Sequence, residues 1–446
     1  MKKVITYGTF DLFHEGHYNL LMHAKELGDY LIVGVTTQHF DEGRGKVNII
    51  DPIMTRIEHV KATGFADEII VEDHEGQKIE DIQKYKADIF TVGSDWVGHF
   101  DYLNAFCKVV YLPRTPGISS SLKRAKSIVN LGVIGTGRLG PRFLEEAKYV
   151  SGIEIVAAFN PNKLDGTARK YQEVHNIPVE QEDFDAFLSV VDAVFIASPN
   201  ETHYEYAKKA LNAGKHVLSE KPLTFTRADA EELYKLAKSN GIVLMEGIRT
   251  AYCPGFQQLI NIAKSGKIGE IVDVTAAFTR IANPTSREMT DEKYGGAFLE
   301  NGSYPLLPII KLMGKDFTDV EIDSIDGPNG IDYYTQVRLK YKNGFATAKS
   351  GVAVKSEGQL VVAGTEGYIL APSPWWLTKS FDIRYEDPNK VEHYEPVFRG
   401  DGFRYEIVEF IRKIKGIEGG GYMLTAGESI AMADVVEKFL RQRGRI

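Results

Sequence analysis

The sequence predicts an α/β protein in which two parallel-sheet domains precede an α+β domain with a mostly antiparallel open sheet. Three observations support this fold class. The 446 residues are enough for about three domains. Strand-like and helix-like patterns alternate from residue 3 to residue 246, which is typical of parallel sheets covered by helices. From about Gly269 the pattern changes to longer stretches in which apolar residues alternate with polar ones.

Two series of short apolar runs predict the strands of the parallel sheets. The first series predicts strands at 3–7, 30–36, 68–71, 88–92 and 108–112, and the second predicts strands at 130–134, 154–159, 193–197, 216–219 and 243–246. Residues 119–127 between the two series are polar and contain few large apolar side chains, as expected of a segment between domains. We therefore expect domains at 1–126, 127–248 and 249–446.

The remaining part of the chain predicts a third domain of a different kind. Period-two alternation in Ile271–Thr279, Tyr333–Tyr341 and Phe345–Val354 predicts longer strands that are mostly antiparallel. Helical patterns follow near 402–415 and 425–442. We expect an open sheet with helices packed on one face.

Composition excludes several classes of protein. Apolar residues make up 43% and charged residues 26%, which is ordinary for a globular chain and rules out a disordered or fibrous one. The net charge of −8 argues against nucleic acid or an anionic membrane as the main partner, so we expect small-molecule partners. Cys107 and Cys253 are too few for a disulfide framework or a structural zinc site. With no long apolar run and no leader pattern, we expect a cytoplasmic protein. We also expect the protein to be a homo-oligomer.

The first chemical motif follows the first strand, where Gly8-Thr9-Phe10-Asp11-Leu12-Phe13-His14-Glu15-Gly16-His17 passes from a loop into a helix. Backbone N–H groups at a helix start attract phosphate. His14 and His17, three residues apart, could donate hydrogen bonds to a triphosphate and to its leaving oxygen. The alternative is that both histidines are ordinary cap or surface residues.

This ten-residue string resembles the HxGH signature of the cytidylyltransferase branch of the nucleotidylyltransferases, in particular the glycerol-3-phosphate cytidylyltransferases. The resemblance covers roughly residues 1–125. The segment Arg114–Ser120 is similar to the family's RTxGIS signature, and Gly93-Ser94-Asp95-Trp96 is similar to its GDDW segment, with Ser94 in place of the first aspartate.

The resemblance implies a set of binding residues and a fold, a nucleotidylyltransferase Rossmann-like sheet. The residues that would contact CTP, with His14 and His17 also catalytic, are Thr9, Phe10, His14, His17, Lys46, Arg114, Thr115, Gly117, Ile118, Ser119, Ser120 and Ser121. The acceptor side would use Arg44 and Lys78 to hold a phosphate, with Asp95 nearby. Arg44 and His99 stand where lysines are expected, so the identity of the polyol stays open.

The chemistry that the resemblance implies needs no covalent intermediate. An oxygen of the acceptor phosphate attacks the α-phosphorus of CTP in line, and pyrophosphate leaves. Mg²⁺ would arrive with CTP, and we expect no dedicated protein site for a metal.

The second motif, Gly135-Thr136-Gly137-Arg138-Leu139-Gly140, is a GxGxxG turn between a predicted strand and a predicted helix. In that position it indicates a dinucleotide-binding Rossmann domain. The second strand of this domain ends near Asn160, which is neither the acidic residue that favours NAD nor the arginine that favours NADP. The choice between NAD and NADP therefore stays open.

Together with Ala197–His203 and Ser219-Glu220-Lys221-Pro222-Leu223, the glycine turn resembles the Gfo/Idh/MocA oxidoreductases over about residues 128–446. The resemblance implies a lysine, Lys221, beside the nicotinamide, where it can move the proton that accompanies hydride transfer. The bond before Pro222 is a candidate cis peptide. The implied cofactor residues are Gly135, Thr136, Gly137, Arg138, Leu139, Asn160, Pro199, Asn200, His203, Glu220 and Lys221.

The family's other catalytic patch corresponds here to Glu300 and Tyr304, which follow Gly295-Gly296. Glutamate replaces the usual aspartate, and Tyr304 is either a proton donor or an aromatic residue of the core. The segment Glu246–Arg249 departs from the family pattern, so the substrate cannot be inferred from it. Trp375 and Trp376 would line a ligand pocket or belong to the core or an interface.

These motifs predict a bifunctional enzyme. The reductase half would use NAD(P)H to reduce a small phosphorylated ketose or aldose, such as dihydroxyacetone phosphate, to a polyol phosphate. The transferase half would join that product to CTP and give a CDP-polyol such as CDP-glycerol, a precursor for cell-surface polysaccharide. The alternatives are a non-catalytic dinucleotide-binding or oligomerisation module after the transferase, a CDP-ribitol-type enzyme, and a transferase that uses ATP.

Overall fold

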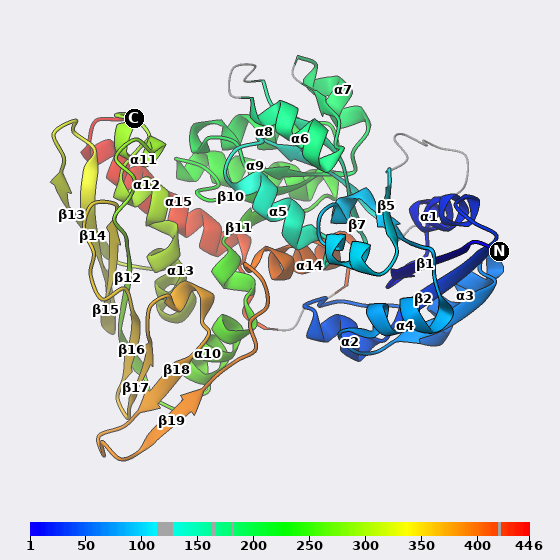
Figure 1. Cartoon of the computed structure of the whole chain (residues 1–446). Coiled ribbons are helices and arrows are strands. Elements are labelled where there is room, and N and C mark those ends of the chain that lie inside the picture. Colours follow the sequence, from blue (N-terminus) through cyan, green and yellow to red (C-terminus); the bar gives the residue numbers. More distant parts are fainter. Residues whose placement is uncertain (114–127, 162–165, 181, 418–420) are drawn as a thin grey trace. The chain divides into compact units, whose positions relative to one another are not determined.

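The computed structural model describes residues 1–113, 128–161, 166–180, 182–417 and 421–446. The chain forms two compact units, residues 1–131 with 143–190 and residues 132–142 with 191–446 (Figure 1). Each unit is described by itself below. No helix within the described ranges combines the length and the apolar character that crossing a membrane requires.

The first sheet has five parallel strands in the order β3-β2-β1-β4-β5, as the alternating pattern predicted. The strands are β1 Lys3–Gly8, β2 Tyr30–Thr36, β3 Glu68–Glu72, β4 Ile89–Gly93 and β5 Lys108–Leu112. The helices are α1 Glu15–Glu26, α2 Gln38–Gly43, α3 Ile53–Ala62 and α4 Gln77–Tyr85, followed by the 3₁₀ turns η1 Ser94–Trp96 and η2 Asp101–Ala105.

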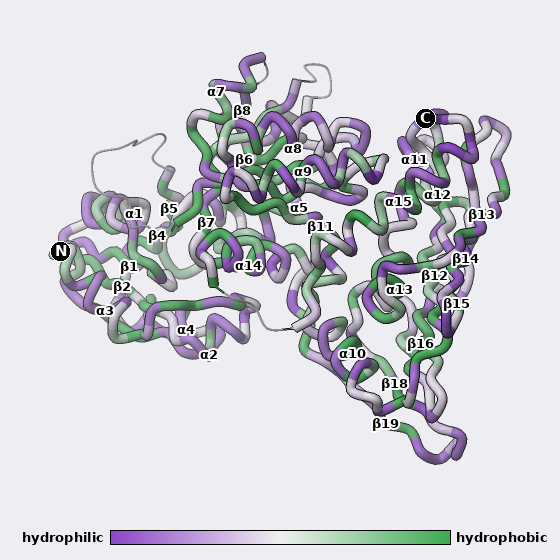
Figure 2. The backbone as a smooth tube through the Cα atoms, turned by 180° about the vertical axis from the view of Figure 1, so that it is seen from behind, coloured by the Kyte–Doolittle hydropathy of each residue, from purple (hydrophilic) through white to green (hydrophobic). Residues whose placement is uncertain are grey.

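Both faces of this sheet are covered, which explains why its central strands are continuous apolar runs. Val4, Leu31 and Val33 belong to a core on one face, and Ile5 and Ile32 belong to a core on the other. Figure 2 shows these strands as apolar segments between more polar helices. The carboxyl end of β1, where the first motif lies, is therefore fixed by two cores.

The second sheet has six strands in the order β11-β10-β9-β6-β7-β8. The strands are β6 Val129–Ile134, β7 Ile153–Phe159, β8 Val179–Glu180, β9 Ala193–Ile196, β10 His216–Glu220 and β11 Leu244–Gly247. The helices and turns are α5 Leu139–Ala147, α6 Thr167–His175, α7 Phe184–Ser189, η3 Asn200–Thr202, α8 His203–Asn212 and α9 Arg227–Asn240. The five predicted strands are confirmed, and only the two-residue β8 was missed.

The third sheet has eight strands in the order β13-β14-β15-β12-β16-β17-β18-β19. Its strands are β12 Ile271–Thr279, β13 Asp319–Asp326, β14 Asp332–Tyr341, β15 Gly344–Gly351, β16 Leu360–Gly364, β17 Tyr368–Ala371, β18 Phe381–Arg384 and β19 Val391–Tyr394. All neighbours are antiparallel except β12 and β15, which run parallel. The predicted mostly antiparallel sheet is confirmed.

Helices accompany one face of this sheet, and α12, α13 and α15 lie along it in Figure 1. The helices and turns are η4 Arg249–Tyr252, α10 Pro254–Lys264, α11 Arg287–Thr290, α12 Ala297–Asn301, α13 Ser303–Met313, η5 Trp375–Leu377, α14 Phe403–Ile414 and α15 Ala426–Gln442. The last two agree with the helices that the sequence predicted. The fold class is thus α/β with two parallel sheets and a terminal α+β part.

Candidate active sites

The loop after β1 is held in an unusual backbone conformation. Phe10 and Leu12 have φ values of 52° and 45°, which non-glycine residues rarely adopt. Asp11 accepts hydrogen bonds from the backbone N–H groups of Ile50 and Asp51, and the N–H of Leu12 donates to Asp51 Oδ2 at 3.0 Å. Such strain persists only where the surroundings fix it.

A fully buried arginine, Arg56, holds this loop through hydrogen bonds to main-chain carbonyls. Arg56 has no exposed surface, and its Nη1 donates to the carbonyl of Thr9 at 2.7 Å and to that of Thr36 at 2.8 Å. Its Nε donates to the carbonyl of Asp51 at 3.0 Å. Burial lowers the pKa of Arg56, although Asp41, Asp11 and Asp51 oppose that shift. One guanidinium therefore joins the end of β1, the end of β2 and the start of α3.

The two histidines of the first motif meet at the start of α1. Their ring centroids are 3.9 Å apart. Nδ1 of His14 accepts from the N–H of Gly16 at 3.0 Å, which caps the helix and places the proton of a neutral His14 on Nε2. Nδ1 of His17 is buried and has no hydrogen-bond partner among the described residues. Burial, with the charges of His14 and Lys46, holds the pKa of His17 well below its ordinary value.

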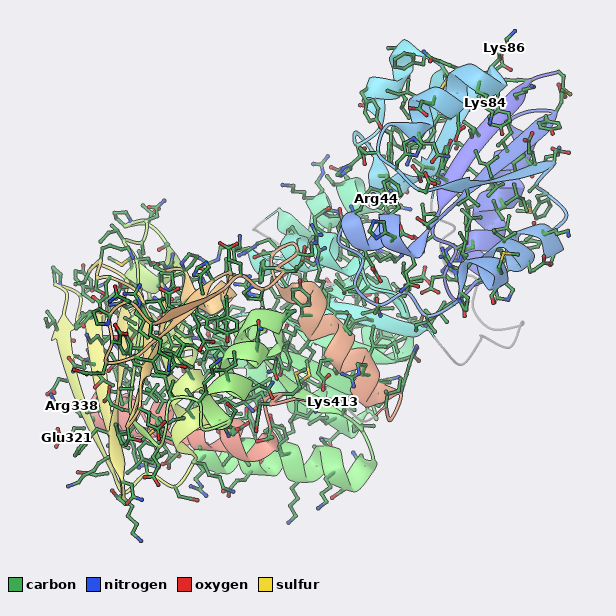
Figure 3. All side chains as sticks on the ribbon, turned by 90° about the horizontal axis from the view of Figure 1, so that it is seen from below. Arg44, Lys84, Lys86, Glu321, Arg338 and Lys413 are labelled. Carbon is green, nitrogen blue, oxygen red and sulfur yellow. The ribbon has the colours of Figure 1, made fainter. Side chains whose placement is uncertain are left out.

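Basic side chains gather near the end of α2. Burial lowers the pKa of Lys46, while Asp41 and Asp11 act to raise it. Arg44 pairs with Asp41 at 2.6 Å and lies over the ring of Phe40, and its side chain is about one third exposed (Figure 3). Arg44 therefore already has a carboxylate partner, Asp41, with which an acceptor phosphate would have to share it.

Lys78 is far more enclosed than a solvated surface lysine. It is 8% exposed, and its ammonium pairs with Glu72 and lies 4.7 Å from the centroid of Tyr7. Burial lowers the pKa of Lys78, and Glu72 opposes that shift. An acceptor phosphate could use this ammonium only by competing with Glu72 for it.

The other residues of the predicted transferase site divide into two groups. Thr9 contributes its carbonyl to Arg56, the ring of Phe10 is buried, and Asp95 lies in η1. Contact between Phe10 and CTP would therefore involve its main chain. The second signature lies outside the described residues, and with it Arg114, Thr115, Gly117, Ile118, Ser119, Ser120 and Ser121.

In the second unit, the glycine turn after β6 has the features that a bound pyrophosphate needs. Gly135 has a φ of 94°, and a Cβ there would come within 2.7 Å of the backbone N of Ser198. Around Gly137 a Cβ would meet nothing within 4 Å, so the main chain is open on that side. Thr136 is buried, and Leu139 begins α5. A dinucleotide pyrophosphate fits this arrangement.

Two further predicted cofactor segments are joined by a histidine. His203 is buried between the carbonyl of Ser198 at 3.0 Å and that of Pro222 at 2.9 Å. Burial lowers its pKa, although both carbonyls favour the protonated ring. Pro199 precedes η3, and Asn200 Oδ1 accepts from Arg287 at 3.2 Å. Asn160 follows β7 and is buried, with its backbone N bonded to the carbonyl of Glu180.

Lys221 follows β10, and its bond to Pro222 is cis. Its Nζ donates to the main-chain carbonyl of Glu300 at 2.6 Å and lies 5.6 Å from the centroid of the Tyr304 ring. Burial raises the pKa of Glu220, while Lys221 and Arg249 oppose that shift. Lys221 and Tyr304 are thus neighbours, as two proton-transfer groups of one site would be.

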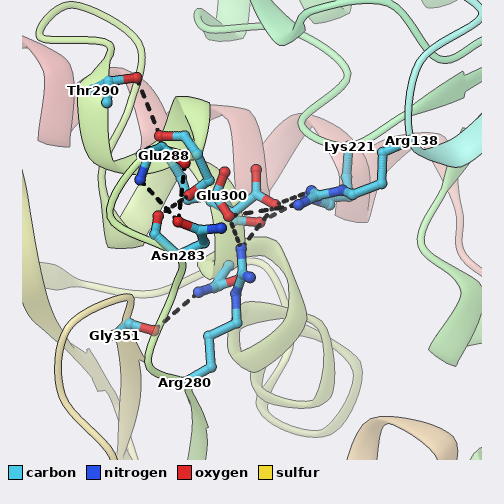
Figure 4. A network of polar contacts seen from close by, with 11 residues as sticks. Arg138, Lys221, Arg280, Asn283, Glu288, Thr290, Glu300 and Gly351 are labelled. Carbon is cyan, nitrogen blue, oxygen red and sulfur yellow. Dashed lines mark hydrogen bonds and ion pairs between the residues drawn. The ribbon is translucent and has the colours of Figure 1, made fainter.

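The carboxylate of Glu300 belongs to an ion-pair network with Arg138 and Arg280 (Figure 4). It accepts from Arg138 at 2.7 Å and from Arg280 at 3.4 Å. Both arginines also pair with Glu288, which is 5% exposed. Burial acts to raise the pKa of Glu288, but its hydrogen bonds and the two arginines hold it below its ordinary value. Glu300, which the resemblance placed in a catalytic patch, thus has an ion-paired carboxylate in the structure.

Tyr304 lies between a cation and aromatic rings. Its hydroxyl accepts from Arg249 Nη2 at 3.3 Å, and Arg249 also pairs with Asp401 at 2.7 Å. The ring of Phe278 stacks on Tyr304 at 4.9 Å and contacts Trp376 at 4.0 Å, centroid to centroid. Trp376 therefore joins an aromatic cluster with Tyr304, whereas its neighbour Trp375 is fully buried.

Sequence reasoning missed several residues of both sites, namely Arg56, Glu288, Arg280 and Asp401. None belongs to a recognisable motif. A buried charge is visible only once the fold is known, so the sequence carried no clear signal for them. No group of three His, Cys, Asp or Glu side chains in the described part of the chain could hold a metal ion.

Comparison with known families assigns the two parts of the chain. A family model described as cytidylyltransferase-like matches residues 5–130. Glycerol-3-phosphate cytidylyltransferase of Bacillus spizizenii is 50% identical over 125 residues, which are 27% of this chain and 93% of that protein. The Bacillus subtilis enzyme of the same name is 47% identical over 125 residues, again 27% of this chain and 93% of that protein.

The second part matches two other models. Residues 129–248 match an oxidoreductase family with an NAD-binding Rossmann fold, and residues 256–370 match the GFO/IDH/MocA C-terminal domain. A scyllo-inositol 2-dehydrogenase (NADP⁺) of Bacillus subtilis is 28% identical over 327 residues, 71% of this chain and 98% of that protein. The crystal structure of a 3-ketoreductase from Actinomadura kijaniata with NADP and TDP-benzene is 25% identical with a TM-score of 0.59, over 70% of this chain and 96% of that chain.

The chain is a fusion of a nucleotidyltransferase and an NAD(P)-binding oxidoreductase. It belongs to the cytidylyltransferase-like family through its N-terminal part and to the Gfo/Idh/MocA oxidoreductases through the remainder.

Proposed function

We propose that this enzyme carries out two consecutive reactions. The reductase part, in domains 127–248 and 249–446, reduces a small phosphorylated ketose or aldose, with dihydroxyacetone phosphate as the first candidate. The transferase part, domain 1–126, converts the resulting polyol phosphate and CTP into a CDP-polyol and pyrophosphate. The observation that carries the proposal is that the His14–His17 pair and the Lys221–Tyr304 pair occur in one chain.

The transferase reaction needs donors at the phosphates of CTP. Burial holds the pKa of His17 well below its ordinary value, and its Nδ1 has no hydrogen-bond partner among the described residues, so a phosphate oxygen of CTP could bond to this ring. As the phosphates approach, their charge favours a protonated His17, which can stabilise the leaving pyrophosphate. Arg44 and Lys78 would hold the acceptor phosphate, and Mg²⁺ would accompany CTP.

The reductase reaction needs a proton donor near the carbonyl oxygen. The bound nicotinamide supplies hydride to the carbonyl carbon. Lys221, held by the carbonyl of Glu300, or Tyr304, whose hydroxyl faces Arg249, supplies the proton to the carbonyl oxygen. The remaining residues, Gly135, Thr136, Gly137, Arg138, Leu139, Asn160, Pro199, Asn200, His203 and Glu220, would hold the dinucleotide. NADP is the first choice of cofactor because the two relatives described above use or bind NADP.

The order of the reactions follows from their chemistry. Reducing dihydroxyacetone phosphate gives glycerol phosphate, and reducing a pentulose phosphate gives a pentitol phosphate such as ribitol phosphate. Either product is an acceptor of the kind that this transferase family uses. The three-carbon acceptor is favoured by the identity of 50% to a glycerol-3-phosphate cytidylyltransferase.

A second candidate function keeps the transferase active and makes the remainder a dinucleotide-binding module without turnover. The ion pairs of the Glu300 carboxylate with Arg138 and Arg280 favour this second function, because a carboxylate held by two arginines is a poor group for proton exchange.

A one-pot reaction tests the proposal. Wild-type protein with CTP, Mg²⁺, NADPH and dihydroxyacetone phosphate should form CDP-glycerol without added glycerol phosphate, as measured by mass spectrometry. Lys221→Ala should form it only when glycerol phosphate is supplied. Product from ribulose phosphate alone would select the ribitol pathway. In the remaining outcome, the wild type forms no CDP-polyol from any ketose or aldose phosphate and forms it only when a polyol phosphate is added. That result would favour the second candidate function, a dinucleotide-binding module without turnover.

A further inference from the structure

Behind the Glu220–Lys221 segment lies a buried carboxyl group that the reactions above do not use. Glu406, in the first turn of α14, has no exposed surface. Neither of its carboxyl oxygens has a hydrogen-bond partner among the described residues. A Cβ placed on Gly247, at the end of β11, would come within 3.1 Å of Glu406 Oε1. The carboxyl group is therefore enclosed beside the strand ends that carry the reductase site.

An ionised carboxylate in that position would be expensive. Burying a charge without hydrogen bonds is strongly unfavourable, so such a group normally takes up a proton instead. Arg249 is a candidate counter-ion, because its charge favours the ionised form of Glu406 and its guanidinium lies over the ring of Phe403 in the first turn of α14. However, Arg249 directs its hydrogen bonds to Asp401 and to the hydroxyl of Tyr304.

The titratable groups around Glu406 come from several elements. Glu220 ends β10 and Glu246 lies in β11, while Arg249 and Tyr252 belong to η4. Glu409, on α14 itself, is already paired with Arg412 and Lys413. Burial first, and then the charge of Glu220, raise the pKa of Glu406 well above its ordinary value, and only Arg249 opposes them. Burial and the charge of Glu220 thus favour the protonated form of Glu406.

We propose that Glu406 is a protonated positioning residue of the reductase site. Because it carries no charge, it does not draw Arg249 away from its hydrogen bonds to the Tyr304 hydroxyl and to Asp401. If Glu406 were ionised, it would compete for the guanidinium and weaken the contact between Arg249 and the Tyr304 hydroxyl. The role of Tyr304 in catalysis rests on the proposed function, but the protonation of Glu406 does not.

Stability against pH tests the protonation without any activity measurement. In the unfolded chain Glu406 ionises near pH 4.3, whereas in the folded chain it keeps its proton, so its contribution to stability falls as pH rises above that value. Glu406→Gln removes this loss. The variant should therefore melt at a higher temperature than the wild type at pH 7, by about 2 °C or more, and the difference should grow from pH 5 to pH 8.

The matched control is Glu409→Gln, on the same helix. Because Glu409 is an ion-paired carboxylate, its loss should lower the melting temperature. The same negative sign for Glu406→Gln would overturn the proposal, because it would mean that the carboxylate is charged and paired. Glu406→Met should also fold, and failure of both Glu406 variants to fold would overturn it as well.

A spectroscopic measurement gives a direct reading. The infrared difference between wild type and Glu406→Gln at pH 7 should contain the C=O stretch of a protonated carboxylic acid. The Glu409→Gln difference should contain carboxylate bands instead. A carboxylate band for Glu406 would overturn the proposal.

Activity then tests the positioning role. Glu406→Gln should keep reductase turnover within about twofold at pH 7, because the amide is also neutral, and should extend activity to higher pH than the wild type. An alkaline limit that is identical in the two proteins would overturn the positioning role. If the wild type shows no reductase turnover, the proposed function has failed, while the melting and infrared results still decide the protonation.

Discussion

His17 combines a lowered pKa with a buried Nδ1 that has no hydrogen-bond partner in the part of the chain that the structure describes. Replacing it with alanine removes one donor from the phosphates of CTP, a loss that typically costs about 3–4 kcal/mol in the transition state. Pyrophosphate release from CTP and glycerol phosphate should therefore fall by about two orders of magnitude or more. His23→Ala, in the last turn of the same helix, is the control and should keep its rate. Near-wild-type turnover of His17→Ala would contradict the assignment.

Lys221 gives the corresponding prediction for the reductase. Lys221→Met keeps most of the apolar side chain but removes the ammonium that Glu300 holds and that faces Tyr304. Oxidation of NADPH by the carbonyl substrate should fall by two to four orders of magnitude, the usual worth of general acid catalysis, about 10²–10⁴-fold. Cytidylyl transfer should be unchanged in the same preparation. Lys215→Met, which removes a lysine bonded to the carbonyl of Val191, should leave both rates intact.

The lowered pKa of His17 gives a prediction for the pH dependence of CTP binding by the transferase part. Burial holds that pKa well below its ordinary value, so the His17 ring takes up a proton only at lower pH than an ordinary imidazole does. A chain whose His17 titrated normally would change its CTP affinity between pH 7.5 and pH 6. We expect the binding of CTP, measured by calorimetry, to take up a proton when His17 becomes charged against the phosphates. Binding without proton uptake in wild type, or equal uptake in His17→Ala, would contradict this.

Single elements set the geometry of these residues, and the loop after β1 depends on Arg56. Arg56→Met would leave the carbonyls of Thr9, Thr36 and Asp51 without their donor. Because unsatisfied buried groups are costly, the free energy of unfolding should fall by about 3 kcal/mol or more. The loop would also shift, so kcat/KM for CTP should fall by about a hundredfold. Lys61→Met, an exposed position on the same helix α3, is the control for both chemical denaturation and kinetics.

The elements show how far the sequence could be read. The strands of both parallel sheets, except the two-residue β8, were predictable because each is a short apolar run followed by a helical pattern. The strands β13 and β16 to β19 were not predicted, since no helical pattern directly follows each of them to mark a strand–helix unit. The motif residues His14, His17 and Lys221 were predictable from local sequence. Arg56, Glu288 and Glu406 were not, because their importance arises from burial beside residues that are distant in the chain.

At the scale of the whole molecule, the transferase and reductase parts of the chain should respond to different ligands. A ligand present at 100 times its Kd stabilises the part that binds it by about 2.7 kcal/mol. In calorimetric unfolding, CTP with Mg²⁺ should raise one transition, and NADPH should raise another. His17→Ala should weaken only the response to CTP. One transition that both ligands shift equally would mean that the two parts unfold together.

The contact between Lys221 and Glu300 uses an oxygen that every amino acid possesses. Substituting the side chain at position 300 therefore cannot remove the partner of the lysine, and only a displacement of α12 can do so. A series of variants at this position would report on the arginine network alone, with the lysine contact as a constant background. It follows that this site could tolerate, over evolution, a change in the length or charge of that side chain without losing the lysine's orientation.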